Sequence, residues 1–183
     1  MEAMPAPANG QPASAIEVRR LTAADWTQLR AVRLSALAEA PYAFASTLAR
    51  EQEFTDDVWR GRAGSGWTFG AWQAAMIVGL ATGLPPEAAA GSCPAEAEAA
   101  WQLVGMWVAP ESRGRGIADQ LVEAVCELAS RSGAASVTLW VTEVNDRARA
   151  FYRRLGFAPT GRRQLVRPEE PEHFEEELSR RLR

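Results

Sequence analysis

The residues whose chemistry is easiest to interpret form a short turn, 113–118, with the sequence Arg-Gly-Arg-Gly-Ile-Ala, between a strand-like and a helix-like segment. The first turn of a helix has N–H groups without intrahelical acceptors and carries about half a positive charge. Gly114 and Gly116 lack a Cβ, so the main chain there can approach an anion closely. Arg113 and Arg115 add mobile positive charge beside it. The turn therefore predicts a diphosphate-binding loop.

Two other interpretations of this turn are open. A plain glycine turn with solvated arginines would have the same composition. A dinucleotide-binding loop of the Gly-x-Gly-x-x-Gly type needs a small residue at position 119, where the chain has Asp119, a carboxylate that would face the diphosphate. The dinucleotide loop is therefore the poorer match.

The side chains present exclude several other kinds of catalytic site. All 20 basic residues are arginine, so the chain has neither the lysine of a Walker A loop nor a lysine for a pyridoxal Schiff base. Cys93, Cys126 and the single histidine, His173, are too few to hold a structural zinc ion, and we expect no metal. A Ser-His-Asp triad would have to use His173, which lies in a charge-rich tail. The chemistry must therefore come from main-chain amides, carboxylates, tyrosine and arginine.

Composition indicates one globular domain. The chain has 183 residues, of which 47% are hydrophobic, and this is enough to form one core. A formal net charge of -3 gives no reason to expect nucleic acid as a partner. Because the sequence shows neither an apolar run of roughly 20 residues nor a secretion signal, we expect a cytoplasmic protein without a membrane partner. Residues 1–15, rich in Pro and Ala, are expected to be a disordered leader before a single domain at 16–183.

The hydrophobic pattern predicts a mixed α/β domain. Strands are expected at 16–21, 67–73, 75–81, 100–108, 136–142 and after Phe157. Helices are expected between Thr22 and Pro41 and at 50–62, 116–132 and 145–155. In the helix expected at 50–62, Phe54, Val58 and Trp59 face inward. Residues 84–99 are interpreted as a loop or insertion between strands.

Two motifs together resemble the GNAT superfamily of N-acetyltransferases. Arg113, Gly116 and Ala118 match, in order, the family pattern of Arg or Gln, two residues, Gly, one residue, then Gly or Ala. Downstream, the residues that fall at the family's spacing for the next strand and helix are Asn145, Ala148, Phe151, Tyr152, Leu155, Gly156 and Phe157. Two motifs at the correct separation are more specific than either alone.

The resemblance implies a central mixed, mostly antiparallel sheet, flanked by helices and splayed between its fourth and fifth strands, here 100–108 and 136–142. It implies acetyl-CoA as co-substrate, with a pantetheine arm that bonds to main-chain groups left unpaired by the splay. The residues assigned to it are Met106, Trp107 and Val108 at the pantetheine and thioester, Arg113, Gly114, Arg115, Gly116, Ile117 and Ala118 at the diphosphate, and Asn145 facing the pantetheine. Asn145 also fits a plain helix N-cap.

The reaction implied by the resemblance is direct attack of a primary amine, on a small molecule or a peptide N-terminus, on the thioester. Tyr152 would then donate a hydrogen bond or proton to the departing thiolate, although it also fits core packing beside Phe151. Many family members have a Glu on the fourth strand, and the strand here, WQLVGMWV, has none. This leaves the general base open, with Glu143 as the best substitute and Glu51 and Glu53 as weaker candidates.

The acceptor site is expected after the first helix and at the open end of the sheet, with four aromatic residues as candidate lining: Tyr42, Phe44, Trp107 and Trp140. Core packing explains each of them equally well. The acidic run 175–177 is expected to be a solvated face, and the family pattern places it on an edge strand. Two other functions stay open. They are a non-catalytic acyl-CoA-binding or sensor module, and a protein-interaction domain. Whatever the function, a homodimer stays open as an assembly.

Overall fold

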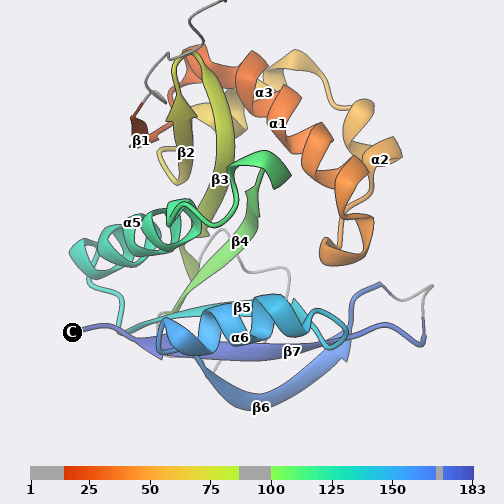
Figure 1. Ribbon diagram of the computed structural model, residues 1–183, viewed down its shortest axis with the longest axis vertical. Helices are drawn as coiled ribbons and strands as arrows, with labels where there is room; N and C mark the ends of the chain where they lie inside the picture. Colours follow the sequence, from red (N-terminus) through yellow and green to blue (C-terminus); the bar gives the residue numbers. More distant parts are fainter. Residues whose placement is uncertain (1–14, 87–99, 168–170) are drawn as a thin grey trace, which may run out of the picture.

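The computed structural model describes residues 15–86, 100–167 and 171–183, and it has a seven-stranded sheet at its centre (Figure 1). The strands lie in the order β1-β2-β3-β4-β5-β7-β6. Their bounds are β1 Ile16–Arg20, β2 Thr68–Gln73, β3 Met76–Leu84, β4 Ala100–Val108, β5 Ser136–Thr142, β6 Ala158–Leu165 and β7 Phe174–Arg181. The helices are α1 Trp26–Glu39, α2 Leu48–Gln52, α3 Asp56–Gly64, α5 Ile117–Arg131 and α6 Asp146–Arg154. The predicted mixed, mostly antiparallel sheet with flanking helices is confirmed.

The sheet splays between β4 and β5. These two strands run parallel, and their register pairs Ala100–Gln102 only with Ser136–Thr138. Beyond these residues β4 and β5 diverge, and Figure 1 shows the sheet opening into two arms. The predicted splay is confirmed. On its β5 side, the rest of β4 therefore has main-chain groups that no neighbouring strand pairs.

Along the splayed part, β4 also has a bulge. The register of β3 against β4 shifts between Leu80 and Thr82. Two residues of β4, Gly105 and Met106, therefore face a single residue of β3. Gly105 has φ of 64°, a left-handed conformation that glycine adopts without steric cost. The bulge re-aims β4 at the point where its partner β5 has already moved away.

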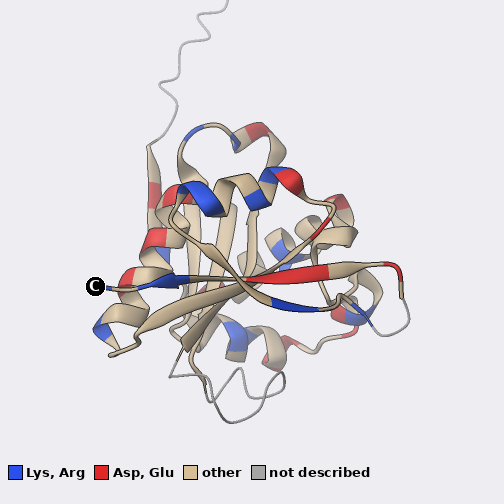
Figure 2. Cartoon of the chain, turned by 90° about the horizontal axis from the view of Figure 1, so that it is seen from below, with Lys and Arg blue, Asp and Glu red and all other residues tan. Residues whose placement is uncertain are grey.

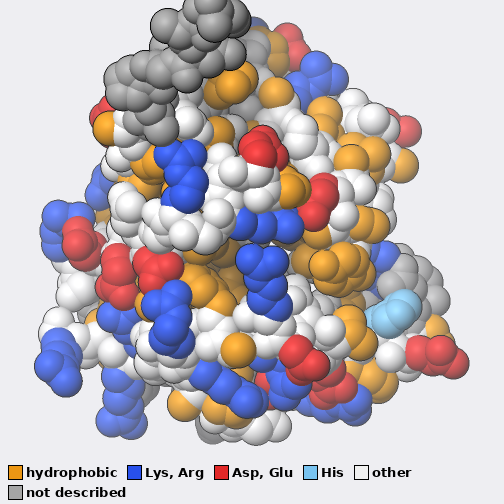
Figure 3. All heavy atoms as spheres, viewed as in Figure 1, with side chains coloured by type: hydrophobic (Ala, Val, Ile, Leu, Met, Phe, Trp, Pro, Cys, Tyr) orange, Lys and Arg blue, Asp and Glu red, His pale blue; other side chains and the backbone are white. Residues whose placement is uncertain are grey.

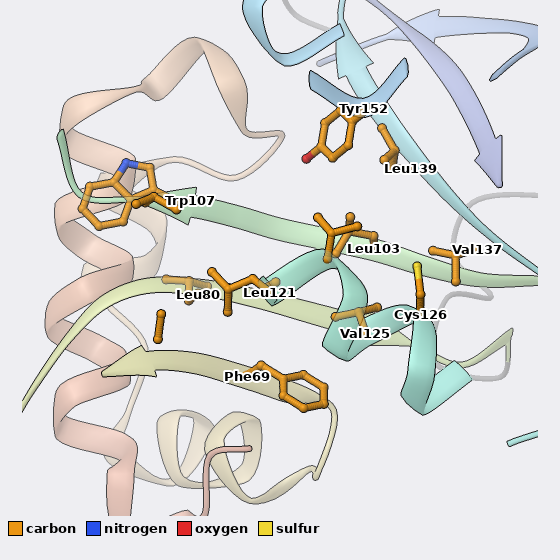
Figure 4. Close-up of a cluster of buried hydrophobic side chains, with 14 of the residues drawn as sticks. Phe69, Leu80, Leu103, Trp107, Leu121, Val125, Cys126, Val137, Leu139 and Tyr152 are labelled. Atoms are coloured by element: carbon orange, nitrogen blue, oxygen red, sulfur yellow. The ribbon is translucent and has the colours of Figure 1, made fainter. Parts of the chain in front are cut away.

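Helix α5 is held on the sheet by its apolar stripe. The residues of this stripe are all buried: Ile117, Leu121, Val125 and Leu128. Figure 4 shows Leu121 and Val125 in one cluster with Leu80 and Leu103 of the sheet. Burying each such side chain contributes roughly 1.5–3 kcal/mol. This packing fixes the N-terminus of α5 at the end of β4.

The single helix predicted at 50–62 is wrong. The structure has two helices there, α2 and α3, and Thr55 is the extended N-cap residue of the second. Thr55 is followed by two aspartates, and acidic residues in a first turn favour a new helix start. Trp59 is buried as predicted, but Val58 is 42% exposed. After the break, both short helices pack against α1.

The acidic run 175–177 is neither a solvated face nor part of an edge strand, so both expectations are wrong. It belongs to β7, which pairs with β5 on one side and β6 on the other. Figure 2 shows this acidic stretch beside a basic stretch of β6. Glu177 is buried and bonds to Arg162 at 3.2 Å, while buried Glu175 accepts a bond from Gln164 at 2.8 Å. Carboxylates are tolerated on this inner strand because they have hydrogen-bond partners.

Two expectations fall on parts of the chain that the structure does not describe. The leader expected at 1–15 lies outside the described residues except for its last residue. The loop expected at 84–99, with Cys93, lies outside them except for its first three residues. Within the described ranges, no helix combines the length and the apolar character that crossing a membrane requires.

Candidate functional site

The turn between β4 and α5 has an open, glycine-dependent main chain. Gly114 and Gly116 have φ of 77° and 74°, in the left-handed region that costs other residues about 1–2 kcal/mol. A Cβ on either glycine would meet no atom within 4 Å. Gly116 is the N-cap residue of α5, and no side-chain hydrogen bond caps this end. The first amides of α5 therefore have no capping side chain, as an anion site requires.

The side chain of Arg113 is fixed, which corrects the expectation of mobile charge. Its Nε donates to the Val108 carbonyl at 2.9 Å, and its Nη2 donates to Glu39 at 2.9 Å. Arg113 thus ties the turn to the end of β4 and the end of α1. The side chain of Arg115 points toward the end of β2, where its Nη1 donates to the side-chain oxygen of Gln73 at 3.2 Å.

A first cavity, of about 520 Å³, lies beside this turn. The structure brings together at this cavity all of the predicted cofactor residues except Arg115, namely Met106, Trp107, Val108, Arg113, Gly114, Gly116, Ile117, Ala118 and Asn145. Figure 3 shows the molecular surface hollowed between α5 and α6, with hydrophobic side chains inside and basic side chains along the edge. The turn, the end of β4 and one face of α6 therefore line one hollow.

Two arginines of α6 that line the first cavity escaped the sequence analysis. They are Arg147 and Arg154, and Arg154 pairs with Asp119 of α5 at 2.7 Å. Asp119, at the position that spoils a dinucleotide loop, thus points toward α6. Their spacing was the available signal, because Arg147 and Arg154 are seven positions apart and such residues lie on one face of a helix. Their positive charge suits an anionic ligand.

Asn145 is the N-cap residue of α6, as predicted, and it also lies at the first cavity. Its Oδ1 accepts a hydrogen bond from the Ala148 amide at 3.1 Å, which caps the N-terminus of α6. The same residue lines the first cavity. The cap uses the oxygen of the side chain, so its NH₂ group is left for another partner.

Tyr152 lies where the first cavity meets a second one. It lines both cavities and is 8% exposed. Figure 4 shows its ring projecting from α6 toward β4. The ring packs edge-on against Phe151 and Phe157, and the hydroxyl has no hydrogen-bond partner in the described parts of the chain. Burial raises the pKa of the Tyr152 phenol, so the group stays protonated and can donate.

The second cavity, of about 600 Å³, continues from the first along β4. The two share the lining residues Ala43, Phe44, Met106 and Tyr152. Of the aromatic residues predicted for the acceptor site, Phe44 lines both cavities, Trp140 lines the second, and Tyr42 and Trp107 line the first. The bulge at Gly105 also lines the second cavity, so both hollows follow the strand that the splay leaves open.

A buried ion pair joins α1 to α2 in the second cavity. Arg33 donates to Glu51 from Nη2 at 2.8 Å and from Nε at 3.1 Å, and Arg62 adds a bond at 2.9 Å. Burial alone would raise the pKa of Glu51, but the bonds and charges of the two arginines outweigh it and lower the pKa to about 2. Glu51 therefore stays ionised and is a poor acceptor for a substrate proton.

The other candidate general bases differ in whether they line a cavity, and Glu143 and Glu175 differ in the direction of their pKa shift. Glu143 lines neither cavity; Arg163 bonds to it at 2.6 and 2.9 Å, and this hydrogen bonding lowers the pKa of Glu143. Glu53 is exposed and also lines neither. Glu175 lines the second cavity, and burial raises its pKa against a smaller opposing effect of Gln164. Sequence analysis missed Glu175 because an acidic run looks solvated. No local signal showed its burial, which depends on the place of β7 between β5 and β6.

The mixed sheet, opened between β4 and β5 beside an uncapped helix N-terminus, is the fold that the resemblance to N-acetyltransferases implied. The acetyltransferase (GNAT) family model matches residues 28–157. The chain belongs to that family.

The individual proteins that resemble this chain either match a short part of it or have low sequence identity. An uncharacterized N-acetyltransferase of Methanocaldococcus jannaschii is 44% identical over 52 residues, which are 28% of this chain and 23% of that protein. The match thus spans less than a quarter of that relative's length. A GCN5-related N-acetyltransferase from Kribbella flavida is 24% identical, with a TM-score of 0.70, over 92% of this chain and 98% of that one.

A second similar structure contains CoA. It is the NatC complex bound to Gag peptide and CoA, with 16% identity, a TM-score of 0.66, and coverage of 92% of this chain and 99% of that one. At this identity, the likeness shows the fold alone.

Proposed function

We propose that this chain is an acetyl-CoA-dependent N-acetyltransferase that transfers an acetyl group to the primary amine of a small molecule or peptide N-terminus by direct attack. One observation supports this most: the uncapped start of α5 opens on a cavity that meets a second cavity at Met106 and Tyr152. A donor molecule and an acceptor molecule can then meet at one point of the splayed strand.

The residues of the first cavity fit CoA. The amides from Gly114 to Ala118 would hold the diphosphate, since no side chain caps that helix end and a Cβ is absent at both glycines. Met106, Trp107 and Val108 would contact the pantetheine and thioester, and Asn145 would face the pantetheine from α6. Acetyl-CoA would supply an activated acetyl thioester when bound.

The acceptor amine must lose a proton. An amine with a pKa near 10.4 costs roughly 4–5 kcal/mol to deprotonate at pH 7. Glu143 was the candidate base from the sequence, and that role stays a prediction. Glu175 has the better position for a base. It lines the second cavity, where the acceptor would bind, is buried, and is bonded only to the neutral Gln164 among the described residues. Glu175 would take the amine proton as the new N–C bond forms.

Breaking the C–S bond leaves a thiolate that needs a proton. Tyr152 is placed at the junction of the cavities, and its hydroxyl is free of other hydrogen bonds in the described residues. Because burial keeps the phenol protonated, it would donate to the departing sulfur. Glu175 and Tyr152 would thus carry out opposite proton transfers, one from the attacking amine and one to the departing sulfur.

A direct test measures acetyl transfer on the full chain with a panel of primary amines. Release of free CoA thiol and a mass increase of the amine by one acetyl group are the expected results. Acetyl-CoA should also raise the Tm, as any ligand of the folded state does. Binding of acetyl-CoA without transfer to any amine would instead support the non-catalytic acyl-CoA-binding module. Failure of both would refute CoA use altogether.

A further inference from the structure

The second cavity carries opposite charges on the two arms of the splay. Arg33, Arg50, Glu51 and Arg62 come from α1, α2 and α3, beside the β4 arm. Glu175 comes from β7, in the arm formed by β5, β7 and β6. A ligand that fills this cavity therefore meets a cationic region on one side and a lone carboxylate on the other.

The cationic side has more positive charge than its own carboxylate can balance. Glu51 is shared by Arg33 and Arg62, and Arg50 has no ion pair in the described part of the chain. The Arg33 side chain is only 9% exposed, and its Nη1 is buried without a hydrogen-bond partner among the described residues. A buried donor without an acceptor costs about 1–3 kcal/mol, so such a group calls for an explanation.

This cationic group lies close to the reacting point. The Nη1 atom of Arg33 is 3.7 Å from the position that a Cβ on Gly105 would take. Gly105 is the bulge residue next to Met106, where the two cavities meet. An anionic group bound there would be only a few bonds away from an amine that attacks at this junction.

We propose that the acceptor is a free amino acid, whose carboxylate is bound by Arg33, Arg50 and Arg62. This inference rests on the proposed function and narrows its acceptor class. A guanidinium offers a planar fork that matches a carboxylate, and one carboxylate balances the surplus charge. Exposed Arg50 and half-exposed Arg62 reach the anion first, and small side-chain shifts of the kind common on binding bring in Arg33.

Glu175 sets the orientation of the amino acid. Its negative charge repels a carboxylate and attracts an amine, so the two ends of the ligand are distinguished by the two arms of the splay. A peptide N-terminus has a neutral carbonyl where a free amino acid has its carboxylate. The cavity therefore favours free amino acids over peptides.

The test compares the common amino acids with their carboxamides and with the corresponding aminoalkyl phosphonates, on the full chain with acetyl-CoA. A carboxamide lowers the pKa of the neighbouring amine, so more of that amine is neutral and reactive. The comparison is thus biased against the proposal. We expect at least one amino acid to have a kcat/KM about tenfold to a hundredfold above its carboxamide, the size of a lost bond to a charged group.

Variants locate the effect. Arg50→Gln, at an exposed residue, and Arg62→Gln should each raise the KM for that amino acid several times more than the KM for its carboxamide. Arg30→Gln, on the exposed face of α1 and outside both cavities, is the matched control and should change neither. Because Arg62 also contacts Glu51 and Trp59, the Tm of its variant is measured as well.

The outcomes separate this inference from the proposed function. Equal turnover of amino acids and carboxamides, or a preference for phosphonates, would overturn the proposed binding of a carboxylate while leaving N-acetyl transfer intact. If no amine is acetylated, Tm shifts of the CoA-bound protein decide. A shift with an amino acid and not with its carboxamide supports the site, and the absence of such a difference overturns it.

Discussion

Glu39, the last residue of α1, accepts a hydrogen bond from Nη2 of Arg113 at 2.9 Å, although the two residues are 74 positions apart in the chain. The same Glu39 oxygen accepts from the indole Nε1 of Trp107 at 3.0 Å. The hydrogen bond from Arg113 is the main cause of the lowered pKa of Glu39, followed by that from Trp107. The carboxylate therefore stays ionised in the neutral range and holds the glycine turn against α1 and β4.

Glu39→Gln should weaken acetyl-CoA binding more than it weakens the fold. The side chains of Arg113 and Glu39 are 31% and 36% exposed, so losing the pair should cost at most about 1 kcal/mol of stability. A less ordered turn should raise the Kd for acetyl-CoA about twofold to tenfold. Calorimetric titration measures this. Glu127→Gln, which removes an exposed pair with Arg131 on α5, is the control, and an equal Kd in both variants would argue against the role of Glu39.

Tyr152→Phe should slow turnover without loosening the fold. The hydroxyl has no hydrogen-bond partner among the described residues, so removing it should leave the Tm and the Kd for CoA nearly unchanged. Loss of a general acid typically lowers kcat about 10²- to 10⁴-fold. Single-turnover kinetics with a thiol reagent measures the step. A variant with the kcat of the parent protein would leave Tyr152 with a packing role only.

Glu175→Gln should lower kcat and raise stability. Burial raises the pKa of Glu175 in the folded protein, so between its unfolded and folded pKa values the folded state binds more protons than the unfolded state. Its contribution to stability is complete below the unfolded pKa and is lost as the pH rises through the folded pKa. Glutamine removes this loss and keeps a hydrogen-bonding side chain.

Two pH series test Glu175. The difference in Tm between Glu175→Gln and the parent protein should grow from acid to neutral pH. The acid limb in the pH profile of kcat should disappear in the variant. A variant that keeps the parent's acid limb would show that another group takes the amine proton.

The part of the site that could be predicted is the part built from neighbouring residues. The glycine turn, the Asn145 cap and the stripe of α5 each depend on residues close together in the chain, so the spacing within each one is visible in the sequence. The splay came from a resemblance, because a sheet opening depends on strands far apart in the chain. The structure confirms it through the short register between β4 and β5.

The parts that were missed depend on distant pairing. Glu175 looked solvated because nothing near it in sequence shows that β7 lies between β5 and β6. Arg113 looked mobile because its partner, Glu39, lies 74 positions away in the sequence. The break between α2 and α3 is different, because Thr55 and the following aspartates are a local start signal that the apolar spacing at 50–62 concealed.

The central claim is that main-chain donors at the start of α5 bind the diphosphate of CoA, and Gly116→Ala tests it most directly. Gly133→Ala is the matched control, because Gly133 ends the same helix, also has positive φ, and also has no atom within 4 Å of its Cβ position. Each alanine should cost about 1–2 kcal/mol of stability through backbone strain. The decisive measurement is the Kd for CoA by calorimetry, at a temperature where both variants are folded. The account predicts at least a tenfold weaker Kd for Gly116→Ala and an unchanged Kd for Gly133→Ala; equal Kd values in the two variants would contradict it.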